Sequence, residues 1–358
     1  MVPLMHKVAD QSVLYLEEFC GKNLDGKAFL RKFALDVIVS TGFGYEINSF
    51  INPNNPFANN CNMLISKQSK YLKMLSKILE MFAPRLFKYL DLPYFDQDVA
   101  EFFVKMISQS IEERKKNGIR RNDFIDLVQD ILVKEGKKDL IGHKDMEELQ
   151  EILVSNAFLL YVVGFEMISS SASVLLYYLS KYPEHQERLF QEIYKAVDDF
   201  GDERLDYTSI MNMKYLEMCL QESQRLYPIS HLERASVKEY RIPTTDITIP
   251  KGIYVRFPIN AVMKDKKYFP NPNIFNPEHF NKENNAKRHA FAFSPFGHGP
   301  RNCIAERFSK MEIKLAVARI IYKFKLLPCE KTVDELIPDP KSRARLPIGG
   351  LWFSLERR

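Results

Sequence analysis

A glycine-rich loop around a single cysteine is the part of this sequence best suited to chemistry. Residues 296–305, here called the cysteine loop, read Phe-Gly-His-Gly-Pro-Arg-Asn-Cys-Ile-Ala, and apolar residues recur at helical spacing from Ile304 to Ile320. The pattern predicts that Cys303 lies at a helix N-terminus, where the partial positive charge favours the thiolate. Arg301 adds a cation two residues before it. Such a thiolate is a soft ligand suited to iron, and the plain alternative is a buried structural cysteine.

A second candidate for chemistry is an acidic residue inside an apolar helix. The segment from Met146 to Tyr182 is apolar on most sides in its middle, which is typical of a buried central helix. Glu166 stands in that apolar run, so we expect it to be either functional or paired with a cation.

The elements that position these residues belong to one large, mostly helical chain. Its 358 residues are 46% hydrophobic and can bury a sizeable core. The net charge of +5 is too slight to indicate a nucleic-acid partner. Five scattered cysteines are typical of a reduced intracellular protein. No signal peptide is visible, and the most apolar stretch, residues 157–164, is far shorter than the roughly 20 residues that span a bilayer.

The cysteine loop resembles the haem-binding loop of the cytochrome P-450 family, Phe-x-x-Gly-x-Arg-x-Cys-x-Gly. The matching positions are Phe296, Gly299, Arg301 and Cys303, whereas Ala305 stands where the family usually has glycine. The resemblance implies that Cys303 is the axial ligand of the haem iron. It also implies that Phe296 shields the sulfur and that Arg301 binds a haem propionate.

The same resemblance implies a structural role for a second motif. Glu222 and Arg225, followed by Leu-Tyr-Pro, match the family's Glu-x-x-Arg helix, whose buried pair locks the core behind the haem. The family's third partner is the arginine of Pro-Glu-Arg-Phe. This chain reads Pro-Glu-His-Phe at residues 277–280, so His279 takes that place. Histidine is shorter and titrates near neutrality, so we expect a weaker lock.

On the oxygen side, residues 163–168 (Val-Gly-Phe-Glu-Met-Ile) align with the family's Ala-Gly-x-Asp/Glu-Thr-Thr. The resemblance implies that Glu166 handles protons and that Met167 replaces the threonine that helps deliver them. Methionine has no hydroxyl to donate. Ser170 and Ser171 lie one helical turn further on and are candidates to replace it.

Further positions take roles from the resemblance alone. Arg234 falls where the family has another propionate-binding arginine, and Gly164 is expected to leave a groove for dioxygen. Arg307, Lys310 and Lys314 are candidates for docking an acidic reductase, with a plain solvated face as the alternative. The residues expected to line the substrate pocket are Phe158, Val163, Ile229, His231 and Leu232.

The resemblance covers nearly the whole chain. It implies a mainly α protein with small β-sheets, the cytochrome P-450 fold, as a single domain over residues 1–358. Because the match begins at Met1, we expect a chain that is incomplete at its N-terminus and lacks the family's membrane anchor, first sheet and first helices. The full-length form is expected at the endoplasmic reticulum membrane (the microsomal fraction), on its cytosolic face. There residues 64–95 would roof the pocket or touch the membrane.

The branch that the chain resembles is the animal xenobiotic-metabolising group. The implied cofactor is haem b, and the implied reaction inserts one oxygen atom from O2 into a lipophilic xenobiotic, steroid or fatty-acid-like molecule. Electrons would come from NADPH through NADPH-cytochrome reductase, with cytochrome b5 as a further candidate partner. Two alternatives stay open: a haem-thiolate isomerase or dehydratase that uses a peroxide without a reductase, and a truncated, non-catalytic product.

Overall fold

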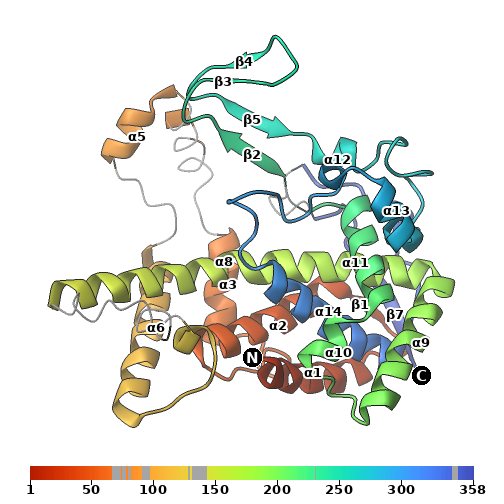
Figure 1. The fold of residues 1–358 in the computed structure, drawn as a ribbon. Helices are drawn as coiled ribbons and strands as arrows, with labels where there is room; N and C mark the ends of the chain where they lie inside the picture. Colours follow the sequence, from red (N-terminus) through yellow and green to blue (C-terminus); the bar gives the residue numbers. More distant parts are fainter. Residues whose placement is uncertain are drawn as a thin grey trace. The chain divides into compact units, whose positions relative to one another are not determined.

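The computed structural model describes residues 1–66, 74, 78–79, 82–90, 97–127, 130, 143–229, 231–340 and 346–358. It is mostly helical with small antiparallel sheets, as the sequence predicts (Figure 1). The chain divides into two compact units, one of residues 1–15 and 31–166 and the other of residues 16–30 and 167–358. The single domain over residues 1–358 stays a prediction.

The helices α1, α2 and α8 each run through both units, and the other elements belong to one unit. The α-helices are α1 (Val2–Glu17), α2 (Gly26–Ile38), α3 (Pro56–Ser66), α5 (Pro84–Leu90), α6 (Gln97–Asn117), α8 (His143–Lys181), α9 (Pro183–Phe200), α10 (Tyr207–Met211), α11 (Lys214–Leu226), α12 (Ile259–Val262), α13 (Lys282–Lys287) and α14 (Glu306–Lys323). Shorter helical turns are η1 (Val39–Phe43), η3 (Pro277–Phe280) and η4 (Ala290–Ala292).

The first unit has an aromatic core. The rings of Phe43, Phe57 and Phe103 lie 6.1–6.3 Å apart, and the Tyr161 ring packs 4.1 Å from that of Phe103. The Tyr161 hydroxyl donates to the Phe57 carbonyl over 2.8 Å, so this polar group is satisfied inside the core. These contacts join η1, α3, α6 and the first half of α8.

The strands lie in the second unit and pair antiparallel. Strands β1 (Asn23–Asp25), β7 (Trp352–Arg357) and β6 (Phe324–Leu327) form one sheet in the order β1-β7-β6. Strand β2 (Leu232–Ala235) pairs with β5 (Tyr254–Phe257), and between them β3 (Tyr240–Arg241) pairs with β4 (Thr248–Ile249) in a hairpin (Figure 1).

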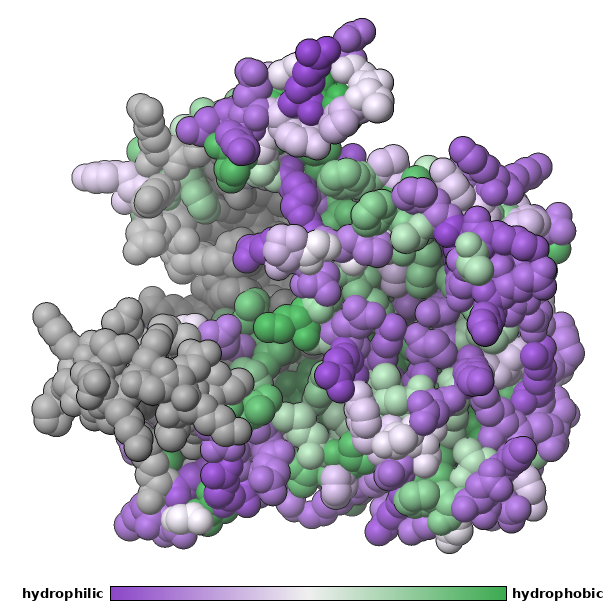
Figure 2. Space-filling model, viewed as in Figure 1, coloured by the Kyte–Doolittle hydropathy of each residue, from purple (hydrophilic) through white to green (hydrophobic). Residues whose placement is uncertain are grey.

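Helix α9 illustrates how local sequence sets an element of the second unit. Pro183 starts it, since the first helical residue needs no N–H, and Gly201 ends it with a φ of 77°. Leu189 and Ile193 form its buried face, and the buried Gln186 donates to the Leu326 carbonyl of β6 over 2.9 Å. Its other face is exposed, and the surface over α9 is mainly hydrophilic (Figure 2).

One helical stretch of the described chain, Phe158–Lys181 of α8, is long and apolar enough to cross a membrane. Within it, 69% of the tested window is buried inside the protein. The core helix of a soluble protein has the same properties, so this stretch is weak evidence for a membrane span. It matches the buried central helix that the sequence predicts.

Candidate functional site

The cysteine loop is a tight turn that ends in an exposed thiol. The backbone N–H of Cys303 donates to the Phe296 carbonyl over 2.9 Å, and that of Asn302 donates to the Gly299 carbonyl over 3.1 Å. Gly297 and Gly299 have φ values of 74° and 80°, which favour glycine over residues with a Cβ. The side chain of Cys303 is exposed, so it is not the buried structural cysteine of the alternative interpretation.

Helix α14 starts later than the sequence suggests. It begins at Glu306 with Ala305 as its N-cap, so Cys303 precedes the helix instead of opening it. Ile304, expected on the buried apolar face, is 97% exposed. The reason is local: the Cys303 N–H bonds back to Phe296, and the first helical bond runs from the Ser309 N–H to the Ala305 carbonyl.

Strand β2 packs against the cysteine loop. The Arg234 side chain donates from Nη2 to the Arg301 carbonyl over 3.4 Å. A Cβ built on Gly297 would lie 3.6 Å from Leu232 Cδ1 and 3.9 Å from Arg234 Nη2, so both side chains reach the loop backbone. Leu232 and Arg234 share one side of the strand because they are two residues apart. The structure therefore brings Arg234 and Leu232 to the loop that carries Cys303.

The Phe296 ring lies under a cation. Lys310 Nζ is 5.5 Å from its centroid and forms ion pairs with Glu217 over 3.2 Å and with Glu306 over 2.9 Å. Burial alone would lower the pKa of Lys310, but Glu217 and Glu306 raise it above its usual value. Lys310 of α14 thus stays charged, pairs with Glu217 of α11 and lies over the Phe296 ring of the cysteine loop.

The sequence interpretation of Lys314 as part of a docking face is wrong. Its side chain is only 1% exposed, and its Nζ lies 2.8 Å from Glu217. It also donates to the Met211 carbonyl over 3.1 Å. Lys314 faces inward because α14 is buried on nearly every side. Arg307 does lie on the surface, where it donates to the Tyr207 hydroxyl over 3.2 Å.

Glu222, Arg225 and His279 meet in what we call the buried triad. Arg225 donates from Nε and Nη2 to the two Glu222 carboxylate oxygens, each over 2.7 Å, and both side chains are fully buried. His279 Nδ1 lies 3.0 Å from Glu222 Oε1. Burial would raise the pKa of Glu222, but the bonds from Arg225 and His279 hold it below its usual value. The pair is therefore internal and not a surface pair.

The first unit holds Glu166 and its partner. Arg31 Nε lies 3.3 Å from Glu166 Oε2, and the same guanidinium lies 5.7 Å from the Phe165 ring. Sequence reasoning expected a cation or a function for Glu166 but did not name Arg31. The expected groove at Gly164 is occupied: a Cβ there would lie 2.7 Å from Ile38 Cδ1, so this glycine lets α2 approach α8.

The second unit holds Met167 and the serines after it. Met167 is half-buried, and the hydroxyl of Ser170 accepts from Lys27 Nζ over 2.7 Å. Ser171 accepts from Gln224 Nε2 over 3.3 Å. Lys27 is only 7% exposed, and no pattern in the sequence indicates that it reaches α8. Both candidate hydroxyls therefore already serve to tie α8 to neighbouring elements.

The residues expected to line a substrate pocket are spread over both units. In the first unit, Phe158 packs 5.5 Å from Phe103, and the side chain of Val163 lies outside the described residues. In the second unit, Ile229 packs against the cluster formed by Val174, Tyr177, Tyr227, Leu336 and Leu351. His231 is exposed, with Nε2 3.8 Å from Glu233.

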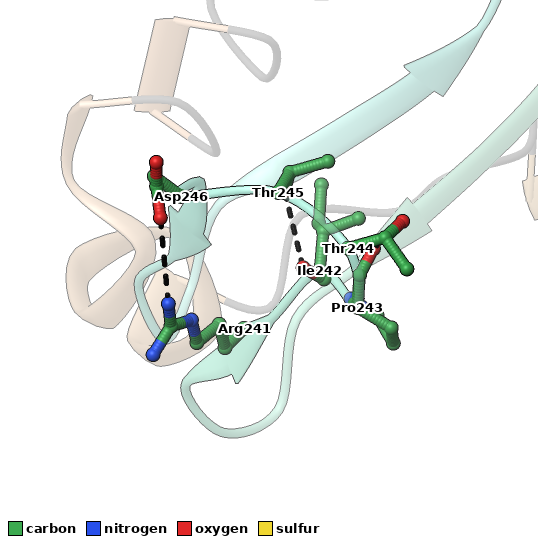
Figure 3. A pocket seen from close by; sticks show the side chains of 6 residues that line it. All are labelled: Arg241, Ile242, Pro243, Thr244, Thr245 and Asp246. Carbon is green, nitrogen blue, oxygen red and sulfur yellow. Dashed lines mark hydrogen bonds and ion pairs between the residues drawn. The ribbon is translucent and has the colours of Figure 1, made fainter.

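One pocket that the structure does contain lies away from these residues. It is lined by residues 241–246 at the tip of the β3–β4 hairpin (Figure 3). Arg241 and Asp246 form an ion pair of 3.5 Å, and the Thr245 hydroxyl donates to the Ile242 carbonyl over 3.0 Å. These bonds stabilise the turn, and no predicted site residue takes part.

A comparison with protein families decides the assignment. The family model described as Cytochrome P450 matches residues 1–351. This chain belongs to the cytochrome P450 family. The P450 resemblance predicted from the cysteine loop, the Glu-x-x-Arg helix and their order is thereby confirmed.

Curated relatives of this P450 come from insects and mammals. The chain is similar to cytochrome P450 6A1 of Musca domestica, with 32% identity over 352 residues, or 96% of this chain and 67% of the relative. Cytochrome P450 3A15 of Cavia porcellus is 32% identical over 335 residues, or 93% of this chain and 65% of the relative. Cytochrome P450 3A25 of Mus musculus is 34% identical over 343 residues, with shares of 93% and 65%. The chain thus spans about two thirds of the length of these relatives.

Proposed function

We propose that this P450 is a haem-thiolate monooxygenase that inserts one oxygen atom from O2 into a lipophilic small molecule. Xenobiotics, steroids and fatty-acid-like compounds are the substrate classes that we infer. The observation that supports the proposal most is the exposed Cys303 thiol at the end of a glycine turn, with Arg234 laid against the same turn. Family membership supports the cofactor, haem b.

The residues present fit haem by the chemistry of their donor atoms. Cys303 offers one soft sulfur, and Arg234 and Arg301 offer guanidinium groups that suit two carboxylates. Gly299 has no heavy atom within 4 Å of a built Cβ, so the loop backbone is open there. Ala305, where the family usually has glycine, adds only a methyl group. When bound, a thiolate-ligated haem supplies the activation of O2, because the sulfur donates electron density to iron.

The chain's own residues would then hold the haem, contact the substrate and move protons. Cys303 would hold the iron, Arg234 and Arg301 would hold the propionates, and Phe296 would shield the sulfur. Glu166 would move protons, oriented by its ion pair with Arg31. Met167 can exclude water but cannot donate a proton. By the family resemblance, substrate contacts would come from Phe158, Val163, Ile229, His231 and Leu232.

The electron donors and the location are part of the same proposal. We infer that NADPH supplies electrons through NADPH-cytochrome reductase, with cytochrome b5 as a second candidate, at the cytosolic face of the endoplasmic reticulum membrane. Arg301 and Arg307 are exposed cations of the cysteine loop and α14 that suit an acidic partner. Lys314 is excluded by its burial.

The proposal is tested by loading the purified chain with haem and recording the carbon-monoxide difference spectrum after reduction. We expect the band of thiolate-ligated haem in the wild type and its loss in Cys303→Ser. Cys329→Ser, which changes another partly exposed thiol, is the matched control and should keep the band. Absence of the band in the wild type would favour the non-catalytic alternative. NADPH-dependent oxidation of a lipophilic probe with added reductase then tests turnover.

A second function is favoured by the lack of a hydroxyl at Met167 and by the partners of Ser170 and Ser171. The chain would then act as a haem-thiolate isomerase or dehydratase that rearranges a lipid hydroperoxide without a reductase. Turnover of a hydroperoxide in the absence of NADPH would support it. Met167→Thr separates the two, because it should improve the coupling of NADPH oxidation to product only in a monooxygenase.

A further inference from the structure

His279 is a buried histidine whose two ring nitrogens both face oxygen atoms. Nδ1 lies 3.0 Å from Glu222 Oε1, and Nε2 lies 2.7 Å from the Pro270 carbonyl oxygen. A backbone carbonyl can only accept a hydrogen bond, so Nε2 must carry a proton to bond to it. The same holds at Nδ1 if Glu222 is ionised. A neutral imidazole has one N–H and can satisfy only one of these two oxygens.

Glu222 is ionised in this cluster. Its Oε1 accepts from Arg225 over 2.7 Å and from the backbone N–H of Asn276 over 2.9 Å, in addition to facing His279. Bonds from Arg225 and His279 keep its pKa below the usual value despite burial. The carboxylate therefore acts only as an acceptor, and the arrangement at His279 is complete only for the imidazolium form.

We propose that His279 is a positioning residue that acts as a proton-dependent lock on the segment between α12 and η3. Protonated, it ties η3 to both α11 and Pro270; neutral, it must release one of them. The proposal goes beyond the monooxygenase function, because it requires neither haem nor turnover.

Arg225 also forms hydrogen bonds to the segment that this lock would control. Arg225 Nη1 donates to the carbonyls of Met263 and Pro272 over 2.9 and 2.8 Å, and Asn276 donates to Glu222. These bonds and the one from His279 to Pro270 cover residues 263–276, which have little regular structure of their own. Losing one bond to a charged group should therefore loosen this segment before the helices around it.

Charged and titratable groups surround the lock on several elements. Arg225 of α11 is already neutralised by Glu222, and Arg288, after α13, donates to the His279 carbonyl over 2.7 Å. From α8, burial raises the pKa of Tyr178 so that it stays neutral, and Glu278 of η3 itself pairs with Arg188 of α9. An arginine in place of His279 would stay charged at every accessible pH, because a guanidinium is not deprotonated in proteins.

His185 of α9 is a matched control. It contacts the same segment, with its ring 5.6 Å from that of Phe275, and its Nδ1 lies 2.8 Å from the Tyr215 hydroxyl. Burial lowers the pKa of His185, and a hydroxyl can donate as well as accept, so a neutral ring is satisfied there. Removing it should not change the pH response of the lock.

The test compares the wild-type chain of 358 residues with His279→Arg, His279→Gln and His185→Gln. Amide hydrogen exchange of residues 263–280 is measured between pH 6 and pH 9 and corrected for intrinsic rates. We expect the opening constant of the wild type, divided by that of His279→Arg, to rise about tenfold from pH 6 to pH 9. This is the effect of losing one hydrogen bond to a charged group. Arginine is protonated and glutamine is neutral over the whole pH range. The ratio of the opening constants of these two variants should therefore not change with pH. His185→Gln should follow the wild type. Parallel profiles for the wild type and His279→Arg would overturn the proposal.

A second measurement holds even where His279→Arg does not fold. Ring nitrogen-15 NMR of the histidine-labelled wild-type chain, assigned with His279→Gln, reports the protonation state directly. We expect both His279 nitrogens to be protonated at pH 6 and one to lose its proton as the pH rises. A single neutral tautomer at pH 6 would refute the lock.

Discussion

At the scale of the residue, Glu312 is the most anomalous group of α14. It is fully buried, and neither carboxylate oxygen has a hydrogen-bond partner in the part of the chain that the structure describes. Burial alone raises the pKa of Glu312 well above its usual value, so the folded chain holds it neutral. A buried neutral acid lowers stability most at a pH at which the same group is ionised in the unfolded chain.

Glu312→Met therefore should stabilise the protein at neutral and alkaline pH. Below the acid's ordinary range both states are protonated, and the unfolded state loses its proton first as the pH rises. Replacing the group with an unbranched apolar side chain should add about 1–3 kcal/mol to the free energy of unfolding at pH 8, and less at pH 4. Urea unfolding at pH 8 and at pH 4 measures the change in the free energy of unfolding. Glu335→Gln, on an exposed turn, is the control, and an equal gain at both pH values would contradict the explanation.

At the scale of the element, a buried arginine joins η1, α6 and the turn that follows α6. The charge run over residues 112–121 is most simply a solvated helix end, yet Arg114 is buried. Arg114 Nη2 and Nη1 bind Asp123 over 2.6 Å and Asp126 over 3.0 Å. Two carboxylates hold the pKa of Arg114 above its usual value although burial opposes this. Arg114 is thus an internal anchor in a run whose described neighbours are mostly exposed.

Gly44→Ala is expected to break this anchor. Gly44 has a φ of 77°, and a Cβ there would overlap Arg114 Nη2, so alanine combines backbone strain with displacement of a buried ion pair. We expect a loss of about 2–4 kcal/mol in the free energy of unfolding. Gly42→Ala is the matched control, because its Cβ would meet only Ile38 Cγ2 at 3.9 Å. Equal losses for the two variants, measured by thermal or urea unfolding, would reject this account.

At the scale of the whole molecule, the sequence predicted two kinds of feature: local turns set by consecutive residues, and distant pairings that the family resemblance implies. The glycine turn before Cys303 follows from ten consecutive residues. The pairing of Glu222 with His279, 57 positions apart, was reachable only through the resemblance. The contacts of Glu166 with Arg31 and of Ser170 with Lys27 were missed, because helical periodicity indicates which face is buried but not which distant side chain meets it. The start of α14 was missed because a backward hydrogen bond from Cys303 outweighs helix propensity.

Each compact unit also contains a buried acid whose pKa is raised by burial. In the first unit Asp36 accepts from the Ser49 N–H over 2.8 Å and from its hydroxyl over 2.5 Å. Burial raises the pKa of Asp36 from 3.8 to about 7, even though the bonds from Ser49 and the charge of Lys32 lower it in part. Glu312, in the second unit, shifts in the same direction.

The contribution of Asp36 to stability should consequently fall as the pH rises from about 4 to 7, because its carboxyl group loses its proton in the unfolded state before it does in the folded state. For Asp36 the loss has an upper limit of about 4 kcal/mol, at 1.36 kcal/mol for each pKa unit. Asp36→Asn keeps an acceptor and a donor for Ser49 but cannot titrate. The unfolding free energy of the wild type minus that of Asp36→Asn, measured with urea across this range, should therefore fall as the pH rises. Asp98→Asn, at an exposed position of α6, should leave the slope unchanged. A difference that stays constant or increases from pH 4 to 7 would show that Ser49 and Lys32 offset the effect of burial on the pKa of Asp36.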